Sequence, residues 1–219
     1  MAPGVAFPDV DGRRVKRLFD LSLSILGIAL LLPLMGLISL AIVLFEGRPV
    51  LFRQHRVGRG GGLFTILKFR TMRPSSPGPQ ITPDGDPRVY AFGAFLRRTK
   101  LDELPQLFNV LCGDMSFVGP RPEVERYVAL YSEKQREVLR FTPGITDPAS
   151  LKYRNESRLL GGVSDPERLY IDRILPDKIE IYLAYARRAT VWSDLRLIIL
   201  TLFAVIADTP RRKRPRSSA

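Results

Sequence analysis

LSLSILGIALLLPLMGLISLAIVLF, residues 21–45, runs for twenty-five positions without a charged side chain. A helix of this length covers the hydrocarbon core of a bilayer, which is about 30 Å thick. The segment is longer than the apolar core of a signal peptide, and the sequence FEGR that follows does not resemble a small-residue cleavage site. The stretch therefore predicts a membrane element, and this element decides the fold class.

The flanks of this segment are basic on both sides, so the positive-inside rule draws both ends towards the cytoplasm. The flanking cations are Arg13, Arg14, Lys16 and Arg17 before it and Arg48, Arg53, Arg56 and Arg59 after it. Pro33, at the midpoint, removes a backbone hydrogen bond and favours a bend. Two interpretations remain open: a re-entrant helix-break-helix over residues 16–47, or an ordinary kinked spanning helix.

The composition limits the chemistry. Lys and Arg number 34 against 22 Asp and Glu, which gives a net charge of +12. This charge favours anionic partners such as nucleic acid, lipid headgroups or phosphorylated substrates. Cys112 and His55 are the only residues of their kinds, so an internal disulfide and a cysteine-based zinc site are excluded. Catalysis must rest mainly on carboxylates, with Lys and Arg stabilising charge.

The length of 219 residues suits one catalytic unit with a membrane element. We expect an α+β, mostly helical fold with several amphipathic interfacial helices. The expected organisation is an N-terminal tail (1–15), the re-entrant membrane helix (16–47), a catalytic domain (48–208) and a basic disordered tail (209–219).

VLFRQ (50–54) and LFTILKFRTM (63–72), on either side of a glycine-rich turn, predict a small β-hairpin. Period-two alternation places Lys68 and Arg70 on one face, either as a phosphate or headgroup site or as charges that prevent edge pairing. A loop is expected over 73–88. Helices are expected over 94–98, 104–111, 123–141, 178–188 and 192–206, the last of them as an interfacial or a core helix.

The densest polar signal is LRRTKLDELPQ (96–106), in which Asp102 and Glu103 follow three cations at the start of a predicted helix. A helix N-terminus attracts phosphate, and carboxylates together with substrate phosphates suit Mg²⁺. A structural alternative is open here, because Thr99 and Asp102 have the spacing of a capping box and Asp102 could itself be the N-cap.

A second signal is CGDMSFVGPRP (112–122), where Gly119 frees the backbone and two prolines stiffen the turn around Arg121. An arginine on so rigid a turn loses little entropy when it binds a phosphate or a nucleobase carbonyl. A rigid surface turn is the alternative. FTPGIT (141–146) makes a similar turn, with Arg140 and Arg154 on either side.

These motifs resemble, in order and spacing, the monotopic phosphoglycosyl transferase family of bacterial sugar transferases. The matching segments are KRLFD (16–20), FRQHRVG (52–58), KFRTM (68–72), RRTKLDELPQLFNVLCGDMSFVGPRPE (97–123) and TPGIT (142–146). The resemblance covers nearly the whole chain, and the DELPQ and GPRPE blocks together are highly specific. The size resembles the minimal, catalytic-domain-only form of the family.

The resemblance implies roles for individual residues. Asp102 would be the nucleophile that attacks the β-phosphorus of a UDP-sugar and expels UMP, and Glu103 its partner in placing Mg²⁺ or the acceptor. Pro33 falls where the family's re-entrant helix breaks, although Leu32 stands before it where the family often has Ser. The residues that would contact phosphates or nucleotide are Lys68, Arg70, Arg97, Pro120, Arg121 and Arg154.

The implied function is transfer of a phospho-sugar to polyprenyl phosphate at the cytoplasmic face of the bacterial inner membrane, the first membrane step of glycan assembly. Downstream glycosyltransferases would be further partners, and no nucleic acid is expected. The alternative is a non-catalytic membrane-bound module that binds a nucleotide-sugar or nucleic acid. The arginines alternate with Gly-Pro turns rather than lining a recognition helix or a stacking platform, which disfavours nucleic acid.

Overall fold

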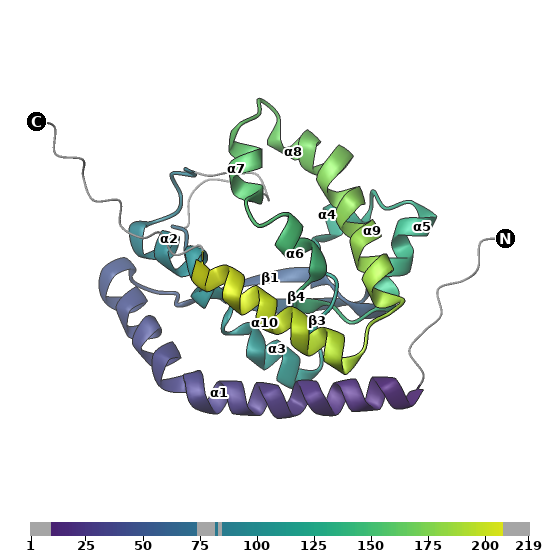
Figure 1. The fold of residues 1–219 in the computed structure, drawn as a ribbon. Coiled ribbons are helices and arrows are strands. Elements are labelled where there is room, and N and C mark those ends of the chain that lie inside the picture. Colours follow the sequence, from purple (N-terminus) through teal and green to yellow (C-terminus); the bar gives the residue numbers. More distant parts are fainter. Residues whose placement is uncertain (1–9, 74–81, 83–84, 208–219) are drawn as a thin grey trace, which may run out of the picture.

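The computed structural model describes residues 10–73, 82 and 85–207 (Figure 1). The predicted basic tail, most of the loop predicted over 73–88 and the first nine residues lie outside this part. Helix α1, Val10–Glu46, begins within the segment predicted as a tail. It is one continuous α-helix through Pro33, so the predicted break is a bend, visible in the second half of the helix in Figure 1. The proline loses one backbone bond without ending the helix.

Helix α1 is the one described helix that is long and apolar enough to cross a membrane. One side of its second half packs on the body, where Met35, Ile38 and Ile42 are buried against Phe69 and Leu96. The opposite side is exposed and apolar along the length of the helix. Its most exposed side chains include Leu18, Ile25, Leu30, Leu37, Leu44 and Phe45. Such a surface is typical of contact with lipid.

Polar contacts fasten the first half of α1 to the body. Arg17 donates to the carbonyl oxygens of Val110 at 2.6 Å and Leu111 at 2.9 Å, at the end of helix α3 (Gln106–Cys112). Lys16 pairs with Asp194 of helix α10 (Val191–Ala207). The buried Asp20 accepts the Phe117 N–H at 3.1 Å. The KRLFD segment thus fixes the membrane helix to the body.

The predicted hairpin is confirmed: β1 (Leu51–Val57) pairs antiparallel with β2 (Leu63–Phe69) around the turn η1 (Arg59–Gly61). Lys68 lies opposite Phe52, and Arg56 lies opposite Phe64 on the same face. Arg53 is opposite Leu67 on the other face. Of the two arginines of β1, only Arg56 therefore shares the Lys68 face.

A second, parallel pair of strands was not expected from the sequence. It joins β3 (Ser116–Val118) to β4 (Gly144–Thr146) and so brings the GPRP and TPGIT turns together. Their backbones meet closely, since a Cβ on Gly119 would lie 2.2 Å from the Thr142 oxygen. The Gly144 N–H donates to the Pro120 oxygen at 2.9 Å. Only glycine fits this crossing.

Helix α2 (Ala91–Arg98), α3, α9 (Leu175–Ala186) and α10 confirm four of the expected helices. The long helix predicted over 123–141 is wrong. The chain forms α4 (Glu125–Val128), α5 (Glu133–Arg136) and η3 (Glu137–Arg140) instead. Ser132 and Gln135 form a capping box that starts a new helix there. Four further short elements were not predicted: α6 (Pro148–Lys152), α7 (Glu156–Gly161), α8 (Pro166–Leu169) and the π-helical η4 (Tyr170–Ile174).

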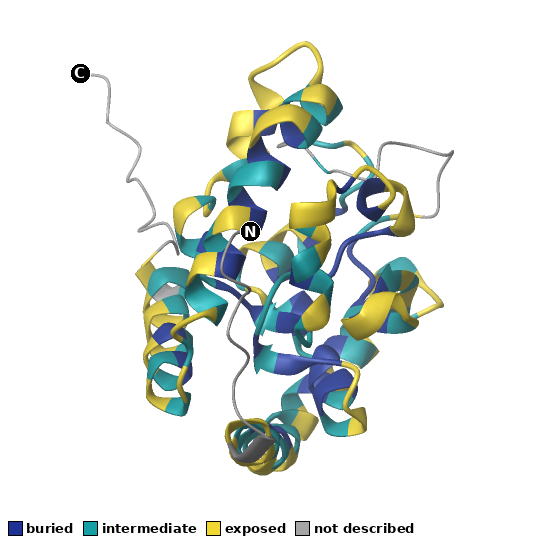
Figure 2. Cartoon of the chain, turned by 90° about the vertical axis from the view of Figure 1, so that its right-hand side faces the viewer, coloured by how far each residue is buried: buried dark blue, intermediate teal, exposed yellow. Residues whose placement is uncertain are grey.

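Buried residues gather where the helices meet the two small sheets, and the outer turns of the helices are exposed (Figure 2). Helix α9 is a core helix, with Ile179 and Tyr182 buried. Helix α10 crosses the body (Figure 1) and carries Trp192 at 80% and Phe203 at 66% exposed. Its outer surface is apolar, which fits the interfacial alternative better than the core one.

Candidate active site

The paired carboxylates Asp102 and Glu103 lie on the 3₁₀ turn η2 (Leu101–Glu103), and both are buried. The preceding residue, Lys100, adopts the left-handed conformation at φ 58°, so the chain turns sharply into η2. Thr99 donates its hydroxyl to the Phe95 oxygen at 2.9 Å. No side chain caps η2 or α3. The interpretation of this motif as a helix cap is therefore wrong.

Glu103 is held by two cations from different elements. Its Oε1 accepts from Lys68 Nζ at 2.9 Å and from Arg121 Nη2 at 2.8 Å. Burial alone would raise the Glu103 pKa, but Arg121 and Lys68 outweigh it and hold the pKa well below its usual range. Glu103 is therefore ionised and fixed in place.

Asp102 has the opposite environment. Its Oδ1 is buried without a hydrogen-bond partner among the described residues. Burial, and then the neighbouring charge of Glu103, raise the pKa of Asp102 to about 6. At neutral pH this carboxylate is mostly ionised and poorly solvated, which are the properties of a reactive nucleophile.

Further positive charge lies around Asp102. Arg97, in the last turn of α2, is half-buried, and its pKa is lowered by burial while Asp102 opposes that shift. Within the described part of the chain, no hydrogen bond occupies its guanidinium. The positive charge of Lys100 also favours the ionised form of both carboxylates and so opposes the rise in pKa that burial causes. These two cations leave donors available for an anionic ligand.

The remaining predicted site residues do not all lie near the carboxylate pair. Pro120 lies in the turn that carries Arg121 and is fixed by its bond to Gly144. Arg70 faces elsewhere: its Nη2 donates to the oxygens of Glu46 at 2.8 Å and Gly47 at 2.6 Å, at the end of α1. The expected convergence of Arg70 with Lys68 is therefore not observed. Arg154 is exposed after α6, and its substrate role stays a prediction.

Behind Arg121 lies a largely buried ion pair, between Arg56 and Glu123, that was not predicted from the sequence. Arg56 donates to the Pro122 oxygen at 3.1 Å and pairs with Glu123 at 3.7 Å. Glu123 also accepts the Tyr170 hydroxyl. Arg56 and Glu123 both belong to the quoted motifs, so those motifs contained a signal for this support of the GPRPE turn.

Asn109 is a second residue that sequence analysis missed. Its amide donates to the Thr65 oxygen at 2.8 Å and accepts the Leu67 N–H at 3.0 Å, which docks α3 on the edge of β2. The signal was a buried amide on an otherwise apolar helix face. Gln106, also buried, has its Nε2 unpaired within the described residues.

The residues present fit a hard cation of the Mg²⁺ type. Asp102 supplies a buried oxygen that lacks a donor, and Glu103 lies beside it. The described residues contain no group of three His, Cys, Asp or Glu side chains able to enclose a metal. Mg²⁺ commonly binds through one or two carboxylates and completes its shell with waters and substrate phosphates.

Fold and site together define a membrane-associated protein with a buried carboxylate pair set among cations, the arrangement that suits chemistry on phosphate groups. Residues 12–208 match the family model described as bacterial sugar transferase. The chain belongs to this family.

Individual relatives are similar over most of the chain. It is 38% identical to the UDP-glucose:undecaprenyl-phosphate glucose-1-phosphate transferase of Caulobacter vibrioides, over 92% of this chain and 73% of that protein. It is 36% identical to the protein of the same name in Escherichia coli, over 87% and 40%. It is 35% identical to the UDP-N-acetylgalactosamine-undecaprenyl-phosphate N-acetylgalactosaminephosphotransferase of Aeromonas hydrophila, over 88% and 44%. The chain thus spans less than half the length of the last two.

Proposed function

We propose that the chain transfers a phospho-sugar from a UDP-sugar to a polyprenyl phosphate and releases UMP, with Asp102 as the covalent nucleophile. The main observation in support of this proposal is the contrast between the two carboxylates. Asp102 is buried, and its Oδ1 has no hydrogen-bond partner among the described residues, whereas Glu103 is bonded to Lys68 and Arg121. The names of the relatives support the donor and acceptor classes.

The proposed reaction has two balanced steps. An Asp102 carboxylate oxygen bonds to the β-phosphorus of the donor while the bond to the UMP oxygen breaks, and UMP leaves with the electron pair. A phosphate oxygen of the polyprenyl phosphate then attacks the same phosphorus, which breaks the acyl-phosphate bond and restores the carboxylate. No proton is transferred overall.

The cations solve the electrostatic problem of this reaction, because a carboxylate must approach phosphates that are themselves negative. Arg121 and Lys68 offset the charge of Glu103. Arg97 and Lys100 are then left to bind the phosphates of the donor. Asp102 and Glu103 would hold Mg²⁺, which when bound would neutralise charge on the diphosphate.

The proposed location is the cytoplasmic face of the bacterial inner membrane. The basic flanks at both ends of α1, its bend and its exposed apolar side support a re-entrant helix. The apolar outer surface of α10 supports a position in the headgroup region.

The topology of α1 can be tested with single cysteines at positions 13 and 48, Arg13→Cys and Arg48→Cys, each in a Cys112→Ser background. The cysteines are labelled with membrane-impermeant reagents on sealed vesicles. Labelling from the same side is expected, and labelling from opposite sides establishes a spanning helix instead.

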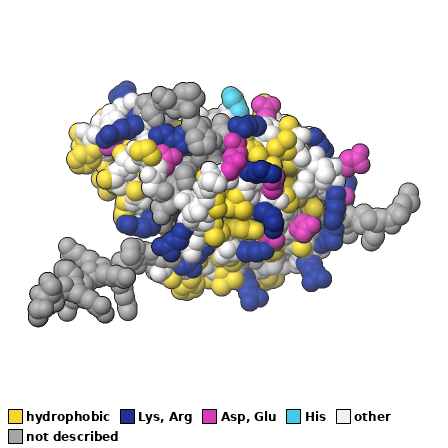
Figure 3. All heavy atoms as spheres, turned by 90° about the horizontal axis from the view of Figure 1, so that it is seen from above, with side chains coloured by type: hydrophobic (Ala, Val, Ile, Leu, Met, Phe, Trp, Pro, Cys, Tyr) yellow, Lys and Arg dark blue, Asp and Glu magenta, His cyan; other side chains and the backbone are white. Residues whose placement is uncertain are grey.

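The nucleic-acid alternative has less support. The face shown in Figure 3 mixes acidic with basic side chains, whereas binding to a nucleic-acid backbone uses a basic surface. The identity of the sugar stays open, because the names of the relatives specify both glucose and N-acetylgalactosamine. A panel of UDP-sugars assayed for UMP release addresses it.

The central experiment traps the intermediate. Purified protein in detergent with Mg²⁺ is incubated with a UDP-sugar alone and analysed by intact mass spectrometry. We expect a sugar-phosphate adduct that Asp102→Asn abolishes and that the exposed control Asp172→Asn retains. Turnover without any adduct on the wild-type protein refutes the covalent mechanism, and UMP release by Asp102→Asn at the wild-type rate refutes the nucleophile.

A further inference from the structure

Gln106 lies one helical turn after the carboxylate pair. The chain follows right-handed helical turns from Leu101 through Pro105 into α3, whose first residue is Gln106. Side chains three and four positions apart in such turns are neighbours, so Gln106 projects on the same side as Asp102 and Glu103. A helical side chain also leans towards the N-terminus of its helix. The Gln106 amide is therefore directed back towards the two carboxylates.

The amide of Gln106 is buried and lacks a partner within the described part of the chain. The residue is 1% exposed, and no described residue accepts a hydrogen bond from its Nε2. The neighbouring Asp102 Oδ1 is a buried acceptor that is likewise unpaired among the described residues. An unpaired buried donor costs stability, and native proteins keep few of them. An unpaired donor and an unpaired acceptor, one turn apart, indicate a place where a ligand binds.

The polar side chains on either side of Gln106 are held by neighbours. Glu103 accepts hydrogen bonds from Lys68 and Arg121. Asn109, three residues further along α3, is bonded to two backbone groups of β2. Gln106 makes no such bond through its Nε2 within the described residues, so the docking of α3 on β2 does not depend on this donor.

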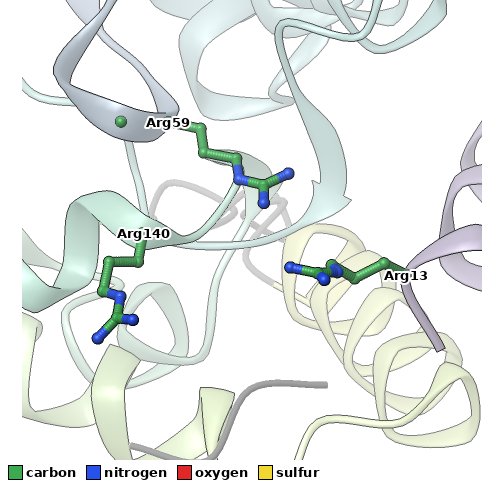
Figure 4. Close-up of a pocket in the computed structure, with 4 residues that line it drawn as sticks. Arg13, Arg59 and Arg140 are labelled. Atoms are coloured by element: carbon green, nitrogen blue, oxygen red, sulfur yellow. The ribbon is translucent and has the colours of Figure 1, made fainter. Parts of the chain in front are cut away.

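The basic hollow shown in Figure 4 lacks this arrangement. It is lined by Arg13, Arg59, Gly60 and Arg140, none of which belongs to the carboxylate site. The guanidinium of Arg140 is turned away from those of Arg13 and Arg59 (Figure 4), so the three charges do not converge on one ligand. The unpaired polar atoms beside Asp102 are therefore the stronger indication of a ligand.

We propose that Gln106 Nε2 donates a hydrogen bond to a non-bridging oxygen of the phosphoryl group that Asp102 attacks. This rests on the proposed function, in which an Asp102 oxygen bonds to the β-phosphorus as the bond to the UMP oxygen breaks. The non-bridging oxygens are negative throughout this step, and a donor already in place stabilises them without rearrangement. Because the amide carries no net charge, it forms no ion pair with Asp102 that would weaken the nucleophile.

The first test compares wild type with Gln106→Met, which keeps the length of the side chain and removes the donor. Protein in detergent with Mg²⁺ and the UDP-sugar that gives the fastest UMP release is followed through a single turnover, without acceptor. We expect the rate constant for UMP release and adduct formation to fall about 100-fold, with the half-saturating donor concentration within about threefold. The melting temperature should not fall, since Nε2 has no partner among the described residues. The same substitution at Gln135, in the capping box of α5, is the control and should keep the wild-type rate.

A second measurement ties the effect to the phosphoryl oxygen. Sulfur accepts hydrogen bonds less well than oxygen. In wild type, one diastereomer of a UDP-sugar with sulfur at a non-bridging position of the β-phosphate should therefore react more slowly than the natural donor. In Gln106→Met this penalty should shrink by about fivefold or more, because the hydrogen bond is already missing and two changes at one contact are not additive.

The other outcomes overturn the proposal in distinguishable ways. An adduct that forms on Gln106→Met at the wild-type rate excludes the hydrogen bond but leaves the covalent mechanism intact. A slower rate with an unchanged sulfur penalty means that Gln106 acts through packing and not on the phosphoryl oxygen. Equal rates for the natural donor and both sulfur diastereomers in wild type exclude the contact without any variant. Turnover by a wild-type protein that never carries an adduct removes the covalent mechanism itself, and this inference with it.

Discussion

Replacing Asp102 with Asn should abolish turnover and at the same time stabilise the protein at alkaline pH. Burial and Glu103 raise the Asp102 pKa from 3.8 to about 6. This rise in the pKa corresponds to about 3 kcal/mol of unfavourable free energy for the ionised side chain in the folded state. The asparagine amide would lack a hydrogen-bond acceptor, which reduces the gain in stability by about 1 kcal/mol. The expected net gain for Asp102→Asn at pH 8 is therefore about 2 kcal/mol.

The pH dependence of this gain in stability tests whether it comes from removing an ionised carboxylate. A carboxyl with a raised folded-state pKa is protonated in both states below about pH 4, where its burial costs little. The cost appears as pH rises from about 4 to about 6 and is complete above that. Thermal unfolding in detergent should show Asp102→Asn above wild type by about 4 to 8 °C at pH 8 but no more stable than wild type near pH 4.

The control is Asp172→Asn, which replaces an exposed carboxylate in an ion pair with Arg168 and should change the melting temperature little. Two results would refute the assignment of Asp102 as a buried, ionised nucleophile. One is an Asp102→Asn variant that is no more stable than wild type at pH 8, and the other is a variant that is more stable by the same amount at every pH.

Single-turnover UMP release should fall about tenfold from pH 7 to pH 5, because protonation of Asp102 with a pKa of about 6 removes the nucleophile; a flat profile contradicts this. Glu103→Gln should cost about 3 kcal/mol of stability, measured by thermal unfolding, because the half-buried Lys68 and Arg121 lose their buried carboxylate partner. Gly119→Ala should prevent normal folding, since its Cβ would lie 2.2 Å from the Thr142 oxygen; soluble, active protein contradicts it. Arg70→Met should lower stability by about 2 kcal/mol but leave KM for the UDP-sugar within about twofold; a large rise in KM would restore its predicted substrate role.

The parts of the fold set by local patterns were predictable. The alternating hairpin strands and the apolar helix α10 depend on residues close in sequence, and both are found. The pairing of β3 with β4 was not predictable, because each strand has three residues and the partner lies more than twenty positions away. The helix expected over 123–141 failed because a stronger local signal, the capping box at Ser132, divides it.

In the site too, features set by local sequence were predictable and contacts between distant elements were not. The carboxylates and their cations stand in dense motifs, and Lys68, which the hairpin pattern placed on one face, donates to Glu103. The same rule failed for Arg70, because the unsatisfied carbonyl groups at the end of α1 bind its guanidinium. Asn109 and the Arg56–Glu123 pair act between distant elements, and no pattern of period two or 3.6 reveals such contacts.

The polar contacts at both ends of α1 have a mechanical consequence. Arg17 holds its first half and Arg70 holds its last turn, so the helix cannot tilt independently of the rest of the chain. In the proposed membrane position, the depth at which α1 lies in lipid therefore sets the height of Asp102 above the bilayer. In the proposed reaction, a change of bilayer thickness would therefore alter how the Asp102 carboxylate is aligned with the phosphate of the polyprenyl acceptor.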